Sequence, residues 1–365
     1  MERLAMIRCL SGFLSLSGFG GLFWSSSRRE ILAWTAAGFV VFGLSPPGLA
    51  NGSPYPKTDI RSGGPAMILV LGAEGESEFG ADFDQQADQW RQLALHAGLS
   101  LHSVGRAATN SVVDRVQFQQ LLELAPATDL NPLWLVMIGH GTYDGNEARF
   151  NLRGPDVSAT ELAVWLQPIR RPLLLINTAS SSAPFLNRLS ASNRIVITAT
   201  RDGYEQNYTR FGTYLAQAFG QLGSDLDQDG RISLLEAFLS AADQVKEFYE
   251  SAGRLATEHA LIDDNGDGLG TPADWFRGVR ATKSAAKGAS VDGWRAHQIH
   301  LLPGGEDLQL TPEQRRQRDA LELAIVQWRE KKPELSETEY YSHLESLLLN
   351  LARLLEDRAA TQERP

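Results

Sequence analysis

A histidine and a run of serines each follow a strongly apolar stretch of the sequence, and these residue types could carry out acyl transfer. His140 lies between two glycines directly after LVMI, and Ser180 is the first of three consecutive serines after LLLINTA. A serine hydroxyl attacks only when a positioned base takes its proton and hydrogen-bond donors stabilise the oxyanion. The pattern makes His140 a candidate base, with Asp144 or Asp156 as a candidate residue to orient it.

The segment DLDQDGRISLLE, residues 225–236, has the spacing of an EF-hand calcium loop. Calcium takes six to eight oxygen ligands, and alternate positions of such a loop surround one point, with a glycine at the sharp turn. Gly230 occupies that turn position, and helical sequence lies on both sides. The alternative is an acidic turn that caps the following helix. The expected ligands are Asp225, Asp227, Asp229, Arg231 through its carbonyl, Ser233 and Glu236.

The segment DDNGDGLGTPAD, residues 263–274, repeats the pattern less completely. Its last position is an aspartate, which is one methylene shorter than glutamate and binds calcium bidentately less well. Pro272 also prevents a helix from following at once. A calcium site and an Asx-rich turn are both consistent with this loop. The candidate ligands are Asp263, Asn265, Asp267 and Asp274.

Strand-like and helical segments alternate in the region that holds these residues. Continuous apolar strands separated by helices are typical of a parallel sheet that is covered on both faces. Ligands of such sheets bind beyond the carboxyl ends of the strands, where His140 and Ser180 fall. The sequence therefore predicts an α/β fold with a mainly parallel sheet. The expected strands are 66–73, 99–105, 132–141, 172–179 and 194–200, and the expected helices are 81–97, 112–124, 158–167 and about 208–221.

The 365 residues carry a formal net charge of −10, which argues against a general nucleic-acid binder and suits cation binding. The single cysteine is Cys9. Residues 1–50 contain paired arginines, an apolar run and small residues up to Ala50, which is the order of an export signal. We expect cleavage after Ala50 and export to the periplasm or beyond. The alternative is an uncleaved anchor in the inner membrane.

The C-terminal residues 311–360 are predicted to form a helical hairpin. Thr311 and Ser336 start capping boxes, and Pro333 separates the two helices. Apolar residues of the second helix recur every three to four positions and form one face. This face either packs on the main domain or serves as a partner surface or a dimer seam. Its residues are Tyr341, Leu344, Leu348, Leu351 and Leu355.

Three segments together resemble the caspase-fold cysteine peptidases, and most closely the legumain-like family. They are ILVLGAEGESEFGADFDQQAD, LVMIGHGTYDG and LLLINTASSSA, and ATEHALIDDNGDG is similar to the tail of bacterial members. The resemblance covers roughly 65–275. It implies a caspase-like sheet with a cysteine and histidine dyad, in which His140 takes the histidine position.

The chain departs from this family at the nucleophile and at the specificity pocket. Ala179 falls on the cysteine position, so the resemblance implies a peptidase relative that lacks its nucleophile. Asp84 stands where the family has an arginine that holds asparagine, and a basic ligand group would fit better there. Glu205 could line the same cleft or could simply cap a helix start.

Three functions follow from these residues. The first is a catalytically inactive, calcium-stabilised module that binds a peptide or protein ligand. The second is an active hydrolase that uses Ser180 with His140. The third is an interaction protein that functions through the helical hairpin. The expected organisation is an export segment at 1–50, a linker at 51–64, a caspase-like domain at 65–300 and a hairpin tail at 301–365.

Overall fold

A computed structural model describes residues 59–105, 113–286, 290–302, 304 and 310–362. The predicted export segment 1–50 lies outside these residues, as does most of the predicted linker 51–64. Within the described ranges, no helix is both long enough and apolar enough to span a membrane.

The described chain is built around a seven-stranded sheet with the order β10-β9-β8-β7-β3-β1-β2. Five neighbouring strands are parallel, and β9 and β10 extend the sheet antiparallel at one edge. The α/β prediction with a mainly parallel sheet is confirmed. All five predicted strands are present. The strands are β1 (Ala66–Leu71), β2 (Ser100–Val104), β3 (Leu133–Ile138), β7 (Leu173–Asn177), β8 (Arg194–Thr198), β9 (Leu261–Asp263) and β10 (Thr271–Pro272).

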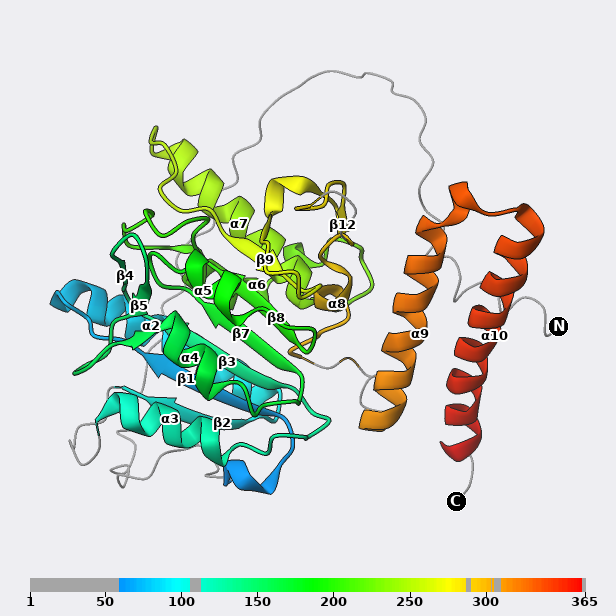
Figure 1. Ribbon diagram of the computed structural model, residues 1–365, viewed down its shortest axis with the longest axis horizontal. Coiled ribbons are helices and arrows are strands. Elements are labelled where there is room, and N and C mark those ends of the chain that lie inside the picture. The colour runs from blue at the N-terminus through cyan, green and yellow to red at the C-terminus, as the bar shows by residue number, and fades with distance from the viewer. Residues whose placement is uncertain (1–58, 106–112, 287–289, 303, 305–309, 363–365) are drawn as a thin grey trace, which may run out of the picture. The chain divides into compact units, whose positions relative to one another are not determined.

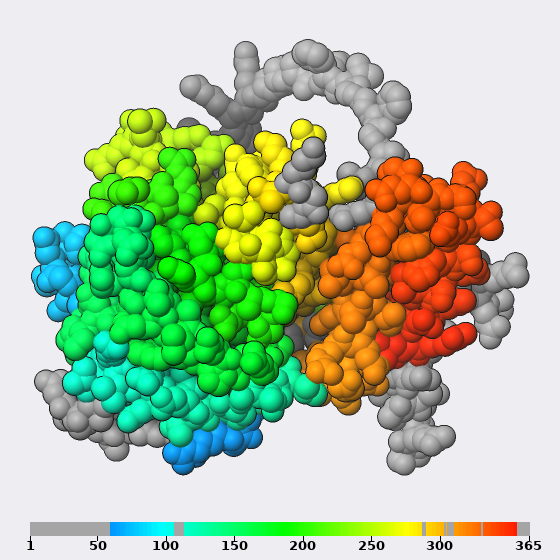
Figure 2. All heavy atoms as spheres, in the orientation of Figure 1, coloured from blue at the N-terminus to red at the C-terminus, as the bar shows by residue number. Residues whose placement is uncertain are grey.

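Helices cover both faces of this sheet, because β1, β3 and β7 are apolar on both sides. Alternate strand residues belong to two separate apolar cores. One core includes side chains of α2, α6 and α7, and the other includes those of α3, α4 and α5, which lie in front of the strands in Figure 1. Side chains of these front helices cover much of the near face in Figure 2. The helices are α2 (Ser77–His96), α3 (Asp114–Leu124), α4 (Ala159–Trp165), α5 (Ala183–Leu189), α6 (Phe211–Ala218), α7 (Leu234–Ser251) and α8 (Trp294–His297).

A small antiparallel sheet that was not predicted from the sequence directly follows His140. Its three strands are β4 (Gly141–Tyr143), β5 (Ala148–Phe150) and β6 (Val157–Ser158), in the order β4-β5-β6. The strands are two or three residues long, so their period of two is too short to be read from sequence. A further pair, β11 (Phe276–Arg277) and β12 (Arg280–Ala281), has strands of two residues each.

The end of the predicted linker is part of the folded body. Residues Ile60–Ser62 form a 3-10 turn, and Ile60 is buried. The buried guanidinium of Arg171 donates hydrogen bonds to the carbonyls of Gly64, Asn131 and Pro132. Residues 59–64 are therefore held against the sheet by a buried side chain.

The C-terminal residues form the predicted helical hairpin. Its helices are α9 (Pro312–Glu330) and α10 (Glu337–Gln362), joined by a 3-10 turn at Lys332–Glu334. Thr311 and Gln314 make the expected capping box. Of the predicted apolar face on α10, Leu344 and Leu351 are half-buried. Tyr341, Leu348 and Leu355 are exposed, at 53%, 38% and 37%.

Candidate functional site

His140 lies just beyond β3 among aromatic rings of the α2 side. Its ring centroid is 4.9 Å from that of Phe79, 5.1 Å from that of Phe83 and 6.4 Å from that of Tyr208. Burial lowers the pKa of His140, and a hydrogen bond with the Glu74 backbone only partly offsets this. The imidazole is therefore neutral at neutral pH and could act as a base if a hydroxyl group reached it.

Ala179 and His140 belong to opposite faces of the sheet. Successive strand residues point to opposite sides. Ala179 is buried in the core that includes Phe185 of α5, whereas His140 contacts rings from α2. The residue of the β7 end that reaches the α2 side is Thr178, whose hydroxyl hydrogen-bonds Gln86 at 3.2 Å. A side chain at position 179 is thus directed away from the imidazole.

The Ser180 hydroxyl is hydrogen-bonded to the main chain of Gly141. Its buried hydroxyl accepts a hydrogen bond from the Gly141 amide and donates one to the Gly141 carbonyl, both at 3.1 Å. Among the described residues, no hydrogen bond joins His140 to Ser180. The hydroxyl proton is directed to a carbonyl, which is not a base strong enough to activate it.

The two following serines are also buried, and neither hydroxyl bonds His140. The Ser182 hydroxyl accepts the amides of Ala199 and Thr200 at 3.1 and 3.2 Å. Ser181 has a φ of 52°, and its buried hydroxyl has no hydrogen-bond partner. The amide of Ser181 donates to the carbonyl of Glu205 at 2.8 Å. Residues 181 and 182 are therefore hydrogen-bonded to the chain that follows β8.

Both glycines around His140 are required by close backbone packing. A Cβ on Gly141 would lie 2.3 Å from the carbonyl oxygen of Ser180. A Cβ on Gly139 would lie 3.0 Å from the Phe150 ring and 3.1 Å from Gly72. Both glycines are buried against neighbouring segments, so they do not open space for a substrate.

Glu205 forms a compact polar group with Arg201 of its own loop and His259 of another segment. Its carboxylate bonds the Nδ1 atom of His259 at 2.5 Å and the Nε atom of Arg201 at 3.2 Å. It also accepts the backbone amides of Arg201 and His259. Its carboxylate therefore links the loop after β8 to the segment before β9. His259 lies 54 residues away from its partner and is preceded by no pattern that predicts this contact.

The two candidate orienting residues contact other groups. Asp144 pairs with Arg149 at 2.8 Å, and this hydrogen bond, together with those from the amides of Glu147 and Asn146, lowers the pKa of Asp144 to about 2. Asp156 accepts the amide of Leu152. Asp84 is exposed on α2, where it lines a groove together with residues of α6. None of the residues that line this groove belongs to the ring cluster around His140. Neither His140 nor Ser180 lines that groove.

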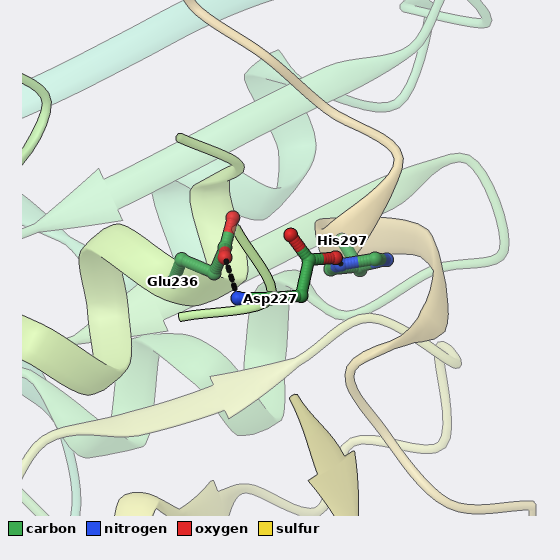
Figure 3. A group of neighbouring side chains, drawn as sticks. All are labelled: Asp227, Glu236 and His297. Atoms are coloured by element: carbon green, nitrogen blue, oxygen red, sulfur yellow. Dashed lines mark hydrogen bonds and ion pairs between the residues drawn. The ribbon is translucent and has the colours of Figure 1, made fainter. Parts of the chain in front are cut away.

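The first acidic loop brings three of its carboxylates close together. Oxygen atoms of Asp225, Asp227 and Asp229 lie within 4.8 Å of one another. Asp227, Glu236 and His297 form a second such group, and Figure 3 shows Asp227 between the other two side chains. The Nε2 atom of His297 lies 3.0 Å from Asp227. This imidazole comes from α8, and no loop spacing could have revealed it.

Backbone and side-chain donors satisfy the loop carboxylates in this structure. Glu236 is buried, accepts the amides of Leu226 and Asp227, and forms a capping box with Ser233 at the start of α7. Asp229 pairs with the guanidinium of Arg231 at 2.7 Å. A calcium ion at this loop would have to displace the Arg231 guanidinium and use the remaining lone pairs of these oxygens.

The second acidic loop is held by Asx-type hydrogen bonds. Asp263 accepts the amides of Gly266 and Gly268, Asn265 accepts the amide of Asp267, and Asp267 accepts that of Leu269. Asp274 is exposed. Across the described ranges, the carboxylates of this loop do not form a group of three ligand atoms like those of the first loop. The geometry favours the Asx-rich turn here.

A buried carboxyl pair missed by the sequence analysis anchors this second loop. Asp264 accepts the amides of Gly293 and Ala296, and Asp292 accepts the hydroxyl of Thr271 at 2.6 Å. Burial, together with the charge of Asp264, raises the pKa of Asp292 to about 8. These bonds fix α8, and therefore His297, beside the first loop.

Comparison with known proteins finds similarity only at the level of structure. No family model and no curated protein matches the chain. Caspase-1 from Spodoptera frugiperda is similar with a TM-score of 0.37 and 10% identity, over 60% of this chain and 92% of that chain. The Drosophila initiator caspase Dronc has a TM-score of 0.36 and 16% identity, over 57% and 82%. A protein from Geobacter sulfurreducens has a TM-score of 0.36 and 12% identity, over 55% and 93%.

Proposed function

We propose that this chain is a caspase-fold, legumain-like peptidase relative that binds a peptide or protein ligand without cleaving it. The observation that carries this proposal is the hydrogen bonding of Ser180, whose hydroxyl is buried and closed onto Gly141. Ala179 supplies no nucleophilic atom and lies in the core on the other side of the sheet. The retained His140 then serves packing among its aromatic neighbours rather than proton transfer.

The alternative is a hydrolase in which Ser180 and His140 act together, and activity-based labelling separates the two. Full-length protein is incubated with a fluorophosphonate probe, which reacts with activated serines. We expect no labelling of wild type, His140→Ala or Ser180→Ala. Labelling that is lost in both variants but kept in His96→Ala, a change of an exposed histidine, would establish the hydrolase.

We further propose that calcium binds the first acidic loop and stabilises the domain. The support is the grouping of Asp225, Asp227 and Asp229 at the start of the loop that precedes α7. Bound calcium would neutralise these carboxylates and hold the turn around Gly230, whose φ is 84°. A melting temperature that is the same in calcium and in EDTA would remove this proposal.

Export remains a proposal that rests on the sequence of residues 1–50. The acidic net charge and the lack of cysteine after Cys9 agree with an exported chain that needs no disulfide. Mass spectrometry of the N-terminus in cell fractions tests it. A periplasmic or secreted chain that begins at Asn51 is expected, whereas an intact N-terminus in the membrane fraction would identify an anchor.

A further inference from the structure

The helix α10 carries two apolar stripes, and the hairpin covers only one of them. The covered stripe faces α9, which lies beside α10 (Figure 1). On this side Tyr340 is buried, and its carbonyl accepts a hydrogen bond from the Trp328 indole of α9 at 3.0 Å. Leu344 and Leu351 share the side of Tyr340 and are half-buried. The second stripe is exposed and consists of Tyr341, Leu348, Leu349 and Leu355.

The exposed stripe of α10 is symmetric about its centre. Tyr341 lies seven residues before Leu348, and Leu355 lies seven residues after it. Seven residues make about two helical turns, so the three side chains follow one line along the helix. A second copy of α10 that runs in the opposite direction would set Leu348 against its own counterpart. The same copy would set Tyr341 against Leu355 at both ends of the contact, because a two-fold axis makes every contact twice.

Two charged side chains beside this stripe have the same symmetry and opposite signs. Glu345 lies four residues before Leu349, and Arg353 lies four residues after it. Both side chains are exposed, and within the described ranges neither forms an ion pair. They are about 12 Å apart along the helix, which is too far for them to pair with each other. An antiparallel second copy would bring each Glu345 next to the Arg353 of the other copy.

A groove of about 210 Å³ along α10 joins these charges to the centre of the stripe. Glu345 and Arg353 line it on either side of Leu349, and small serines leave space between them. A purely acidic or purely basic partner would satisfy only one of the two charges. A second copy satisfies both, so the charge pattern selects self-association. The described lining residues all belong to α10 and are Ser342, Glu345, Ser346, Leu349, Asn350 and Arg353.

We propose that the exposed stripe of α10 is a dimer interface, on which a second copy packs antiparallel about a two-fold axis between Leu348 and Leu349. The apolar and charged patterns are centred one residue apart, about 1.5 Å along the helix, which side chains of this length accommodate. Glu345 and Arg353 form two equivalent ion pairs at the edges of the interface. Four apolar side chains per copy make a small interface, so the dimer dissociates on dilution. The inference goes beyond the proposed function and does not rest on it.

Sedimentation equilibrium of the full chain tests the inference. We expect the wild type to be in a monomer–dimer equilibrium in which the dimer fraction rises with protein concentration. Leu349→Glu sets two like charges face to face at the centre of the interface and should leave only monomer. The matched control is Leu222→Glu, because Leu222 is 93% exposed and lies outside the hairpin. This control should dimerise as the wild type does.

Charge reversal tests the antiparallel direction of the second copy. Glu345→Arg or Arg353→Glu alone places like charges at both contacts and should raise the dissociation constant of the dimer roughly tenfold. The double variant, Glu345→Arg with Arg353→Glu, restores opposite charges and should return this constant to within about threefold of wild type. In a parallel dimer each residue would meet its own counterpart, so the single reversals would not weaken the dimer. Circular dichroism checks that every variant keeps its helix content.

Three results would each overturn the inference. They are a wild type that stays monomeric at every concentration, a dimer that survives Leu349→Glu, and a double variant that dimerises as weakly as the single reversals. The difference between wild type and the single reversals should shrink as salt rises, because salt screens exposed charges. Serine labelling does not depend on α10, so this inference and the proposed function can fail separately.

Discussion

The hydroxyl of Ser180 and the main chain of Gly141 form a closed hydrogen-bonded pair across the carboxyl end of the sheet, with both bonds at 3.1 Å. The pair joins the loop after β7 to the first residue of β4. The serine beside the histidine-containing turn therefore stabilises the fold through these two bonds. The hydroxyl satisfies two backbone groups that the short strand β4 leaves without a partner on that edge.

Ser180→Ala should destabilise the protein by about 1–3 kcal/mol, because it leaves the buried Gly141 amide and carbonyl without their partner. Urea denaturation followed by circular dichroism measures the change. Ser190→Ala is the matched control, since the buried Ser190 hydroxyl has no partner and its removal should be nearly neutral. Similar losses in the two variants would contradict this role of Ser180.

Ser181→Gly should stabilise the protein by about 1 kcal/mol. The residue has a φ of 52°, which glycine adopts without the steric cost that a Cβ brings. The change also removes a buried hydroxyl that has no partner. Thermal unfolding compares it with Ser182→Gly, which deletes two bonds to backbone amides and should destabilise. A lower melting temperature for Ser181→Gly would show that its conformation is not strained.

Gly141→Ala should cost several kcal/mol or prevent folding, because the new Cβ would lie 2.3 Å from the Ser180 carbonyl oxygen. Expression yield and a melting curve check this. Gly223→Ala is the control, because nothing lies within 4 Å of a Cβ at that position. Tolerance of alanine at 141 would mean that the loop after β7 can move away from β4.

The stability of the protein should fall as the pH drops below about 6.5, and His140 should contribute to this fall. Burial lowers the pKa of His140 in the folded state, so the unfolded chain binds the proton first as the pH falls. The contribution is fully present above the unfolded pKa of about 6.5 and is lost below it. His140→Gln should reduce the dependence between pH 7 and 5, measured by urea unfolding. An unchanged pH profile would contradict the assignment.

Calcium should raise the melting temperature of the wild type. At a calcium concentration about one hundred times its dissociation constant, binding adds about 2.7 kcal/mol to the free energy of unfolding. Asp225→Asn removes a ligand of the first loop and should abolish the shift. Asp267→Asn changes the second loop, whose carboxylates bond local amides, and should leave the shift intact. Loss of the shift only in Asp267→Asn would move the site to the second loop.

The sheet could be predicted because β1, β3, β7 and β8 are continuous apolar runs, which burial on both faces requires. The arrangement of the side chains in the candidate site could not be predicted from the sequence. Whether Thr178 or Ala179 faces His140 depends on where β7 ends, and a shift of one residue reverses every side chain. The contacts Glu205–His259 and Asp227–His297 join segments 54 and 70 residues apart. Such pairs are fixed by tertiary packing and leave no local pattern.

The burial of Ala179 determines what a thiol introduced at this position could do. A thiol introduced there by Ala179→Cys would enter the core that includes Phe185, on the side of the sheet away from the imidazole. Such a thiol would remain inert to alkylating reagents in the folded protein. Pairing a thiol at this position with His140 would require the backbone of residues 178–182 to rotate as well, so a single substitution does not create a reactive pair.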